Sequence, residues 1–108
     1  GSAPTRTITK GISAGANSTI EIPKYAKSVS VLPGFFPAGS DNPYAALIRY
    51  RTRPSPNATI FQSTMTGTQL LALGNGATMA IPGGARFLNI FNGEATDCGF
   101  TLVFNLGL

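Results

Sequence analysis

Residues 19–34 read TIEIPKYAKSVSVLPG, and residues 78–93 read TMAIPGGARFLNIFNG. The two stretches align without gaps, and five of their sixteen positions are identical. Each copy contains an Ile-Pro pair, Ile22-Pro23 in the first and Ile81-Pro82 in the second. Proline has no backbone N–H to donate to a β-ladder and therefore marks the point where strand pairing stops. The repeat thus predicts two copies of a strand, a tight Pro-containing corner and a second strand.

Short strands are predicted along the rest of the chain as well. Apolar or alternating runs recur between Gly, Pro and Asn residues, and no helical periodicity is sustained. The predicted strands are residues 5–12, 18–23, 27–32, 44–52, 59–65, 69–73, 77–82, 86–92 and 99–106. We expect 59–65 and 69–73 to form one strand with a break near Gly67, which leaves eight.

Two copies of a four-strand unit are too few for a solenoid, which needs about three or more. They match the two Greek-key halves of a jelly roll. We therefore predict an all-β fold, an antiparallel β-sandwich that forms one eight-stranded single jelly-roll domain over residues 1–108. The polar residues 1–10 could alternatively extend as an N-terminal arm. An immunoglobulin-like sandwich also has short strands, but it lacks the halved symmetry.

The composition limits the function classes. Only 11% of the 108 residues are charged, against about 25% in an ordinary soluble domain. The eight Lys and Arg and four Asp and Glu residues give a net charge of +4, and the hydrophobic fraction of 43% argues against disorder. The single cysteine, Cys98, excludes a disulfide scaffold. No apolar run approaches the ~20 residues of a membrane-spanning helix.

The residues that usually carry catalysis are scarce. The chain has no histidine, the commonest general base and metal ligand. Asp41, Glu94 and Asp97 could hold a hard cation through oxygen ligands, but their spacing matches no calcium loop. We therefore expect no enzyme, no cofactor and no metal site.

A jelly roll would sort the charges between its two ends, because its loops alternate between them. The acids Asp41, Glu94 and Asp97 are expected at one end and the bases Lys24, Lys27, Arg53 and Arg86 at the other. Such a separation suits head-to-tail orientation in an assembly.

Arg49, Arg51 and Arg53 alternate with other residues in one predicted strand. Period-two spacing places such residues on one sheet face or edge. The stripe could meet a carboxylate, a phosphate or a lipid headgroup. Alternatively, it is the solvated face of a strand.

Phenylalanines supply the remaining candidate contacts. One ring of Phe35-Phe36 is expected to plug the mouth of the sandwich and the other to pack against copies of itself at a symmetry axis. The repeat equates Leu88 and Ile90 with Val29 and Val31 as inward residues, so that Phe87 and Phe91 point outward. Outward aromatic residues favour a face that a neighbouring subunit covers.

The segments STIEIPKYAKSVSVLPG, TMAIPGGARFLNIFNG and GFTLVFNLGL together resemble the single jelly-roll capsid proteins of icosahedral viruses. The small size resembles the penton or vertex proteins of tectivirus-like bacteriophages. The resemblance implies a structural protein of the virion, a homopentamer that docks to the major capsid protein or a spike protein. Basic residues would permit contact with the virion membrane or nucleic acid.

A second hypothesis is a glycan- or receptor-binding jelly roll, such as a fibre tip or lectin. Sugar sites present aromatic faces beside polar groups, and Tyr25 and Tyr44 are the candidates for such a face.

Overall fold

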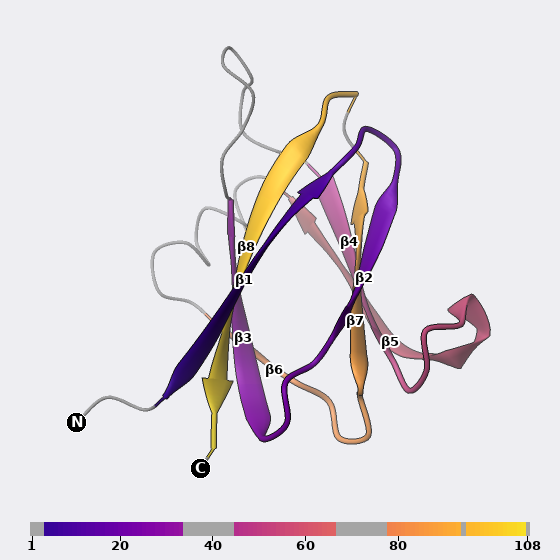
Figure 1. Ribbon diagram of the computed structural model, residues 1–108. Coiled ribbons are helices and arrows are strands. Elements are labelled where there is room, and N and C mark those ends of the chain that lie inside the picture. Colours follow the sequence, from indigo (N-terminus) through magenta and orange to yellow (C-terminus); the bar gives the residue numbers. More distant parts are fainter. Residues whose placement is uncertain (1–3, 34–44, 67–77, 94, 108) are drawn as a thin grey trace.

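The computed structural model describes residues 4–33, 45–66, 78–93 and 95–107. Within these ranges the chain is almost entirely β-structure (Figure 1). The strands are β1 (Thr5–Ile12), β2 (Asn17–Glu21), β3 (Ala26–Pro33), β4 (Ala45–Arg51), β5 (Thr59–Thr66), β6 (Met79–Ala80), β7 (Phe87–Asn92) and β8 (Cys98–Leu106), and one 3-10 turn, η1 (Pro56–Ala58), precedes β5. No helix in the described part of the chain is long and apolar enough to cross a membrane.

The strands form two four-stranded antiparallel sheets. Sheet A has the order β1-β8-β3-β6, and sheet B has the order β2-β7-β4-β5. Figure 1 shows the two sheets facing each other, with sheet A on the left and sheet B on the right. This strand order is that of the jelly roll, and the predicted fold is confirmed.

The core lies between the sheets and is formed by alternate residues of each strand. Sheet B contributes Ile20, Ile48, Tyr50, Leu88 and Ile90; sheet A contributes Ile12, Val29, Cys98, Phe100, Leu102 and Phe104. Leu88, Ile90 and Val29 are fully buried, as the repeat predicts. Cys98 is buried, and its Sγ donates a hydrogen bond to the Thr96 carbonyl at 3.5 Å.

The two copies of the repeat adopt the same corner. In the first corner (residues 23–26) the Ala26 N–H donates to the Pro23 carbonyl at 3.1 Å; in the second (residues 82–85) the Ala85 N–H donates to the Pro82 carbonyl at 3.2 Å. The third residue of each turn has a positive φ, 71° at Tyr25 and 86° at Gly84. This is the pattern of a type II turn.

Backbone hydrogen bonds also join the residues beside the two corners. The Ile22 N–H donates to the Arg86 carbonyl at 2.9 Å, and the Ile81 N–H donates to the Lys27 carbonyl at 3.0 Å. These four residues are equivalent in pairs under the repeat. The internal repeat of the sequence is therefore an approximate two-fold symmetry in the fold, centred between the corners.

Several strand boundaries differ from the sequence prediction at prolines and chain ends. Strand β2 stops at Glu21, two residues before Pro23, and β6 has two residues in place of the six expected for 77–82. Strand β1 pairs with β8 from Thr5 to Ile12, so that residues from Thr5 onward lie in sheet A and do not form an arm. The expected strand 69–73 lies outside the described residues.

Candidate functional site

The outer face of sheet B carries an apolar and cationic layer. Leu88 and Ile90 of β7 point into the core, so Phe87, Asn89 and Phe91 point outward, as predicted for the two phenylalanines. Their cross-strand partners on β4 are Arg51, Arg49 and Leu47, in the same order. Phe87 and Phe91 are half-buried, which leaves part of each ring in contact with water.

Arg49 and Asn89 lie at the middle of this face. The Arg49 guanidinium carbon lies 6.0 Å from the centroid of the Phe91 ring, in the range of a cation–π contact. Asn89 is fully buried, and its Nδ2 donates to Asn17 Oδ1 and Thr19 Oγ1 of β2, each at 2.9 Å. The buried Arg49 Nε and Asn89 Oδ1 have no hydrogen-bond partner among the described residues. The outer face of sheet B therefore combines the half-buried rings of Phe87 and Phe91 and the Arg49 guanidinium with the polar residues that β2 and β5 place beside them, Asn17, Thr19, Glu21 and Gln62.

Arg51 has a structural role that the sequence did not predict. Its side chain is 4% exposed, and its Nε donates to Thr59 Oγ1 at 3.0 Å. The Thr59 hydroxyl in turn donates to the Pro56 carbonyl of η1 at 3.1 Å. Loss of water contact, followed by the charge of Arg49, lowers the pKa of Arg51. Arg51 at the end of β4 is therefore linked to η1 through the Thr59 hydroxyl.

The prediction that Arg49, Arg51 and Arg53 share one sheet face or edge is wrong for Arg53. Strand β4 ends at Arg51, and Arg53 is exposed in the connection to η1. Residues 52–55 lie outside β4, so the period-two spacing of the strand does not continue to Arg53. Only Arg49 and Arg51 share the face.

The outer face of sheet A has a different character. The cross-strand pairs Thr7–Val103, Thr9–Thr101 and Ser28–Asn105 lie on it. The hydroxyls of Thr9 and Thr101 are 3.5 Å apart, and Asn105 Nδ2 donates to Ser28 Oγ at 3.0 Å. Apart from Val103, the residues of these pairs are polar and uncharged, whereas the outer face of sheet B carries rings and guanidinium groups.

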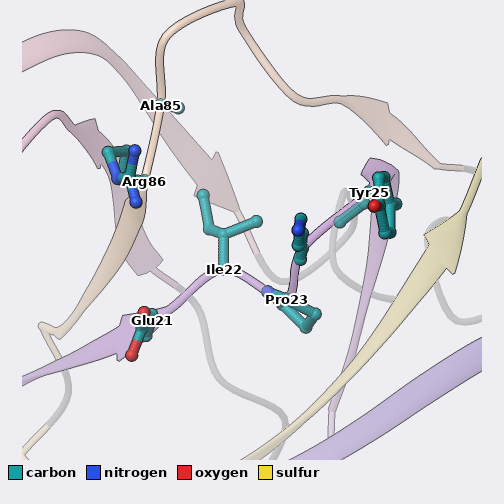
Figure 2. Close-up of a pocket in the computed structure, with 8 residues that line it drawn as sticks. Glu21, Ile22, Pro23, Tyr25, Ala85 and Arg86 are labelled. Carbon is teal, nitrogen blue, oxygen red and sulfur yellow. The ribbon is translucent and has the colours of Figure 1, made fainter.

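The corner end of the sandwich contains a hollow of about 520 Å3, lined by residues 21–26, Ala85 and Arg86; we call it the corner hollow. Figure 2 shows Ile22 and Pro23 in its centre, with Glu21 and Arg86 to one side and Tyr25 to the other. A second hollow of about 260 Å3 shares residues 21–24 with it and adds Arg6 and Ile8 of β1.

Tyr25 is the aromatic residue of the corner hollow. Its side chain is 55% exposed, although its backbone has the positive φ that favours glycine. Lys24 Nζ lies 5.1 Å from the centroid of its ring. The Tyr25 carbonyl accepts a hydrogen bond from the Gly107 N–H at 2.8 Å, which ties the end of β8 to the first corner.

The predicted grouping of bases is found at this end. The Arg86 N–H donates to the Arg51 carbonyl at 2.9 Å, so the β4 end lies beside the second corner, and Lys24 and Lys27 belong to the first corner and the strand after it. Glu21 and Arg6 also lie here, and we did not predict either. Arg6 pairs with the buried Phe104 in the strand register, so it lies on the face of β1 that points towards sheet B. This register is seen only in the structure.

Of the predicted acidic end, the structure describes Asp97. Its Oδ1 accepts a hydrogen bond from the Ala14 N–H at 3.0 Å, which brings the β1–β2 and β7–β8 connections together as expected. Buried Asn92 supports the same junction, because its Nδ2 donates to the Ile12 and Thr96 carbonyls at 3.0 and 2.9 Å. Asp41, Glu94, Phe35, Phe36 and Tyr44 lie outside the described residues.

No protein-family model matches this sequence, and searches of curated proteins and of solved structures gave no match. The two candidate functional surfaces of the protein are the outer face of sheet B and the corner hollow.

Proposed function

We propose that this protein is a structural subunit of a virion, a capsid vertex protein that assembles with copies of itself into a symmetric ring. The contrast between the two outer faces carries the proposal. Sheet A presents threonine, serine and asparagine with Val103, whereas sheet B presents Phe87, Phe91, Leu47 and Arg49 beside the polar residues of β2. Aromatic residues and arginine are enriched at protein–protein interfaces relative to the rest of the surface. We assign the contact between subunits, or with the neighbouring capsid protein, to the outer face of sheet B.

Two further features support assembly. With 11% charged residues, the surface presents few groups that would have to be desolvated when another protein covers it. The jelly-roll strand order agrees with the resemblance to single jelly-roll capsid proteins, although a fold alone does not determine a function. The bases at the corner end and Asp97 at the other end give the subunit a charge direction that would orient it in a ring.

The mass of the purified protein in solution tests this proposal. We expect a closed ring, five copies for a vertex protein, at both low and high ionic strength, because apolar contacts dominate the interface. The substitution Phe91→Glu should reduce the assembly to monomers, since it places a charge in the contact. The matched variant Thr7→Glu adds the same charge to the outer face of sheet A and should leave the ring intact.

Light scattering after size-exclusion chromatography measures the mass, and circular dichroism with thermal unfolding confirms that each variant is folded. A stable wild-type monomer at micromolar concentrations would overturn the proposal. A trimer would overturn the vertex role in favour of a fibre tip or capsid trimer. Equal disruption by Thr7→Glu and Phe91→Glu would show that the outer face of sheet B is not the contact.

A further inference from the structure

We propose that the corner hollow is a binding site for an acidic sugar, a pyranose ring that carries a carboxylate. The hollow lies at the corner end of the sandwich and borders the outer face of sheet B at Glu21, the cross-strand partner of Phe87. This inference goes beyond assembly, because the proposed ligand is a sugar and not another subunit. Its volume of about 520 Å3 is within the range of ordinary small-ligand sites.

The charges around the site favour an anion with hydroxyl groups. Arg6, Lys24 and Arg86 line the corner hollow and its smaller neighbour, together with one carboxylate, Glu21. The cations would bind the ligand carboxylate through charge-assisted hydrogen bonds. An ionised carboxylate such as Glu21 only accepts hydrogen bonds, so it would pair with sugar hydroxyls.

Tyr25 supplies the aromatic surface on which the apolar face of a sugar ring packs. Tyr25 can be compared with Gly84, which occupies the equivalent place in the second corner and also has a positive φ. Glycine adopts this conformation without steric cost, whereas tyrosine does not. The Tyr25 ring is more than half exposed, so burial does not offset that cost. Backbone strain of this kind clusters at ligand sites.

The same residues fit other anions less well. Glu21 would repel a phosphate dianion at close range more strongly than it repels a carboxylate of single charge. Nucleic-acid grooves combine basic residues with several stacked aromatic side chains. The described lining of the hollow contains one aromatic residue, Tyr25. An acidic sugar uses the ring, the cations and the carboxylate together.

Amide NMR titration of the assembled protein tests the site with glucuronic acid as the probe. Glucose is the neutral control, and inorganic phosphate and a short oligothymidylate are the competing anions. We expect saturable shifts with glucuronic acid at the amides of residues 21, 22, 24–26, 85 and 86, and weaker shifts with glucose and with phosphate. Absence of saturable shifts at these residues would overturn the proposal. Tighter binding of phosphate or oligothymidylate would overturn it in favour of a phosphate or nucleic-acid site.

Two variants test the roles of individual groups. Tyr25→Gly copies the residue of the second corner, so the turn should fold, and it should weaken glucuronic acid binding about five- to tenfold. Arg86→Gln should weaken it by a similar factor, whereas Lys10→Gln on β1 is the matched control and should not change it. Equal binding by wild type and Tyr25→Gly would overturn the assignment of the ring. Because neither variant alters sheet B, an unchanged ring mass separates this result from a failure of assembly.

Discussion

The Tyr50 side chain places a phenol in an apolar core. The residue is 1% exposed, and its hydroxyl has no hydrogen-bond partner among the described residues. Burial raises the pKa of Tyr50 to about 12, since the charged form would lose its hydration. In the unfolded chain the same phenol titrates near pH 10.

This difference in pKa predicts alkaline destabilisation. Below pH 10 the phenol is neutral in both states, and its contribution to stability is fully present. Between pH 10 and 12 the unfolded chain loses the proton first, so the free energy of unfolding should fall by about 2–3 kcal/mol. Tyr50→Phe should remove that part of the slope and, at pH 7, be neutral or more stable by about 1 kcal/mol. Urea denaturation at pH 8, 10, 11 and 12 measures both; an unchanged slope in the variant would contradict the assignment.

At the scale of the element, the two corners share one backbone and differ in sequence. The first carries Lys24-Tyr25 where the second carries Gly83-Gly84. A side chain at Gly83 would enter open space and its φ is ordinary, whereas Gly84 combines open space with a φ of 86°. The difference between these two glycines is therefore conformational and not steric.

Exchange of the corner residues should change stability in opposite directions. We expect Gly84→Tyr to lower the free energy of unfolding by about 1–2 kcal/mol. Tyr25→Gly should raise it by up to about 1 kcal/mol, after the greater entropy of the unfolded glycine is subtracted. Gly83→Lys is the matched control, with an effect below about 0.5 kcal/mol. Chemical denaturation provides the values, and equal tolerance of Gly84→Tyr and Gly83→Lys would show that the turn is not strained.

The elements also show what sequence alone could predict. The repeat and its Ile-Pro pairs indicate the corners, the inward Leu88 and Ile90, and the jelly roll, because these depend on local pattern and pairing symmetry. The burial of Arg51 was not predictable, since it depends on η1 folding back to place Thr59 against the guanidinium. The corner hollow was missed for a related reason: Arg6, Glu21 and Arg86 come together only through the strand register.

At the scale of the whole molecule, the two halves of the repeat are interlocked. All six described strand pairings join a strand of the first half, β1 to β4, to a strand of the second, β5 to β8. Neither half contains a hydrogen-bonded strand pair of its own among the described residues. Each sheet therefore exists only when both halves are present.

Division of the chain between Ser55 and Pro56 tests this interlocking. Both residues are exposed, so the cut spares the core. The fragments 1–55 and 56–108 should each be unfolded alone, because an unpaired strand has no ladder to join. Mixed in equal amounts, they should regain β-structure and a cooperative unfolding transition, measured by far-ultraviolet circular dichroism. A cooperative transition in either fragment alone would contradict the expectation.

The interlocking also determines when the chain can fold as it is made. Strands β7 and β8 occupy central places in the two sheets, β7 between β2 and β4 and β8 between β1 and β3, yet they are the last of the eight described strands to be synthesised. The strands of the first half must wait, with their apolar residues uncovered, until β7 and β8 have been translated. Premature termination before Cys98 would therefore release a product that lacks β8, loses the central pairing of sheet A and exposes residues of the core.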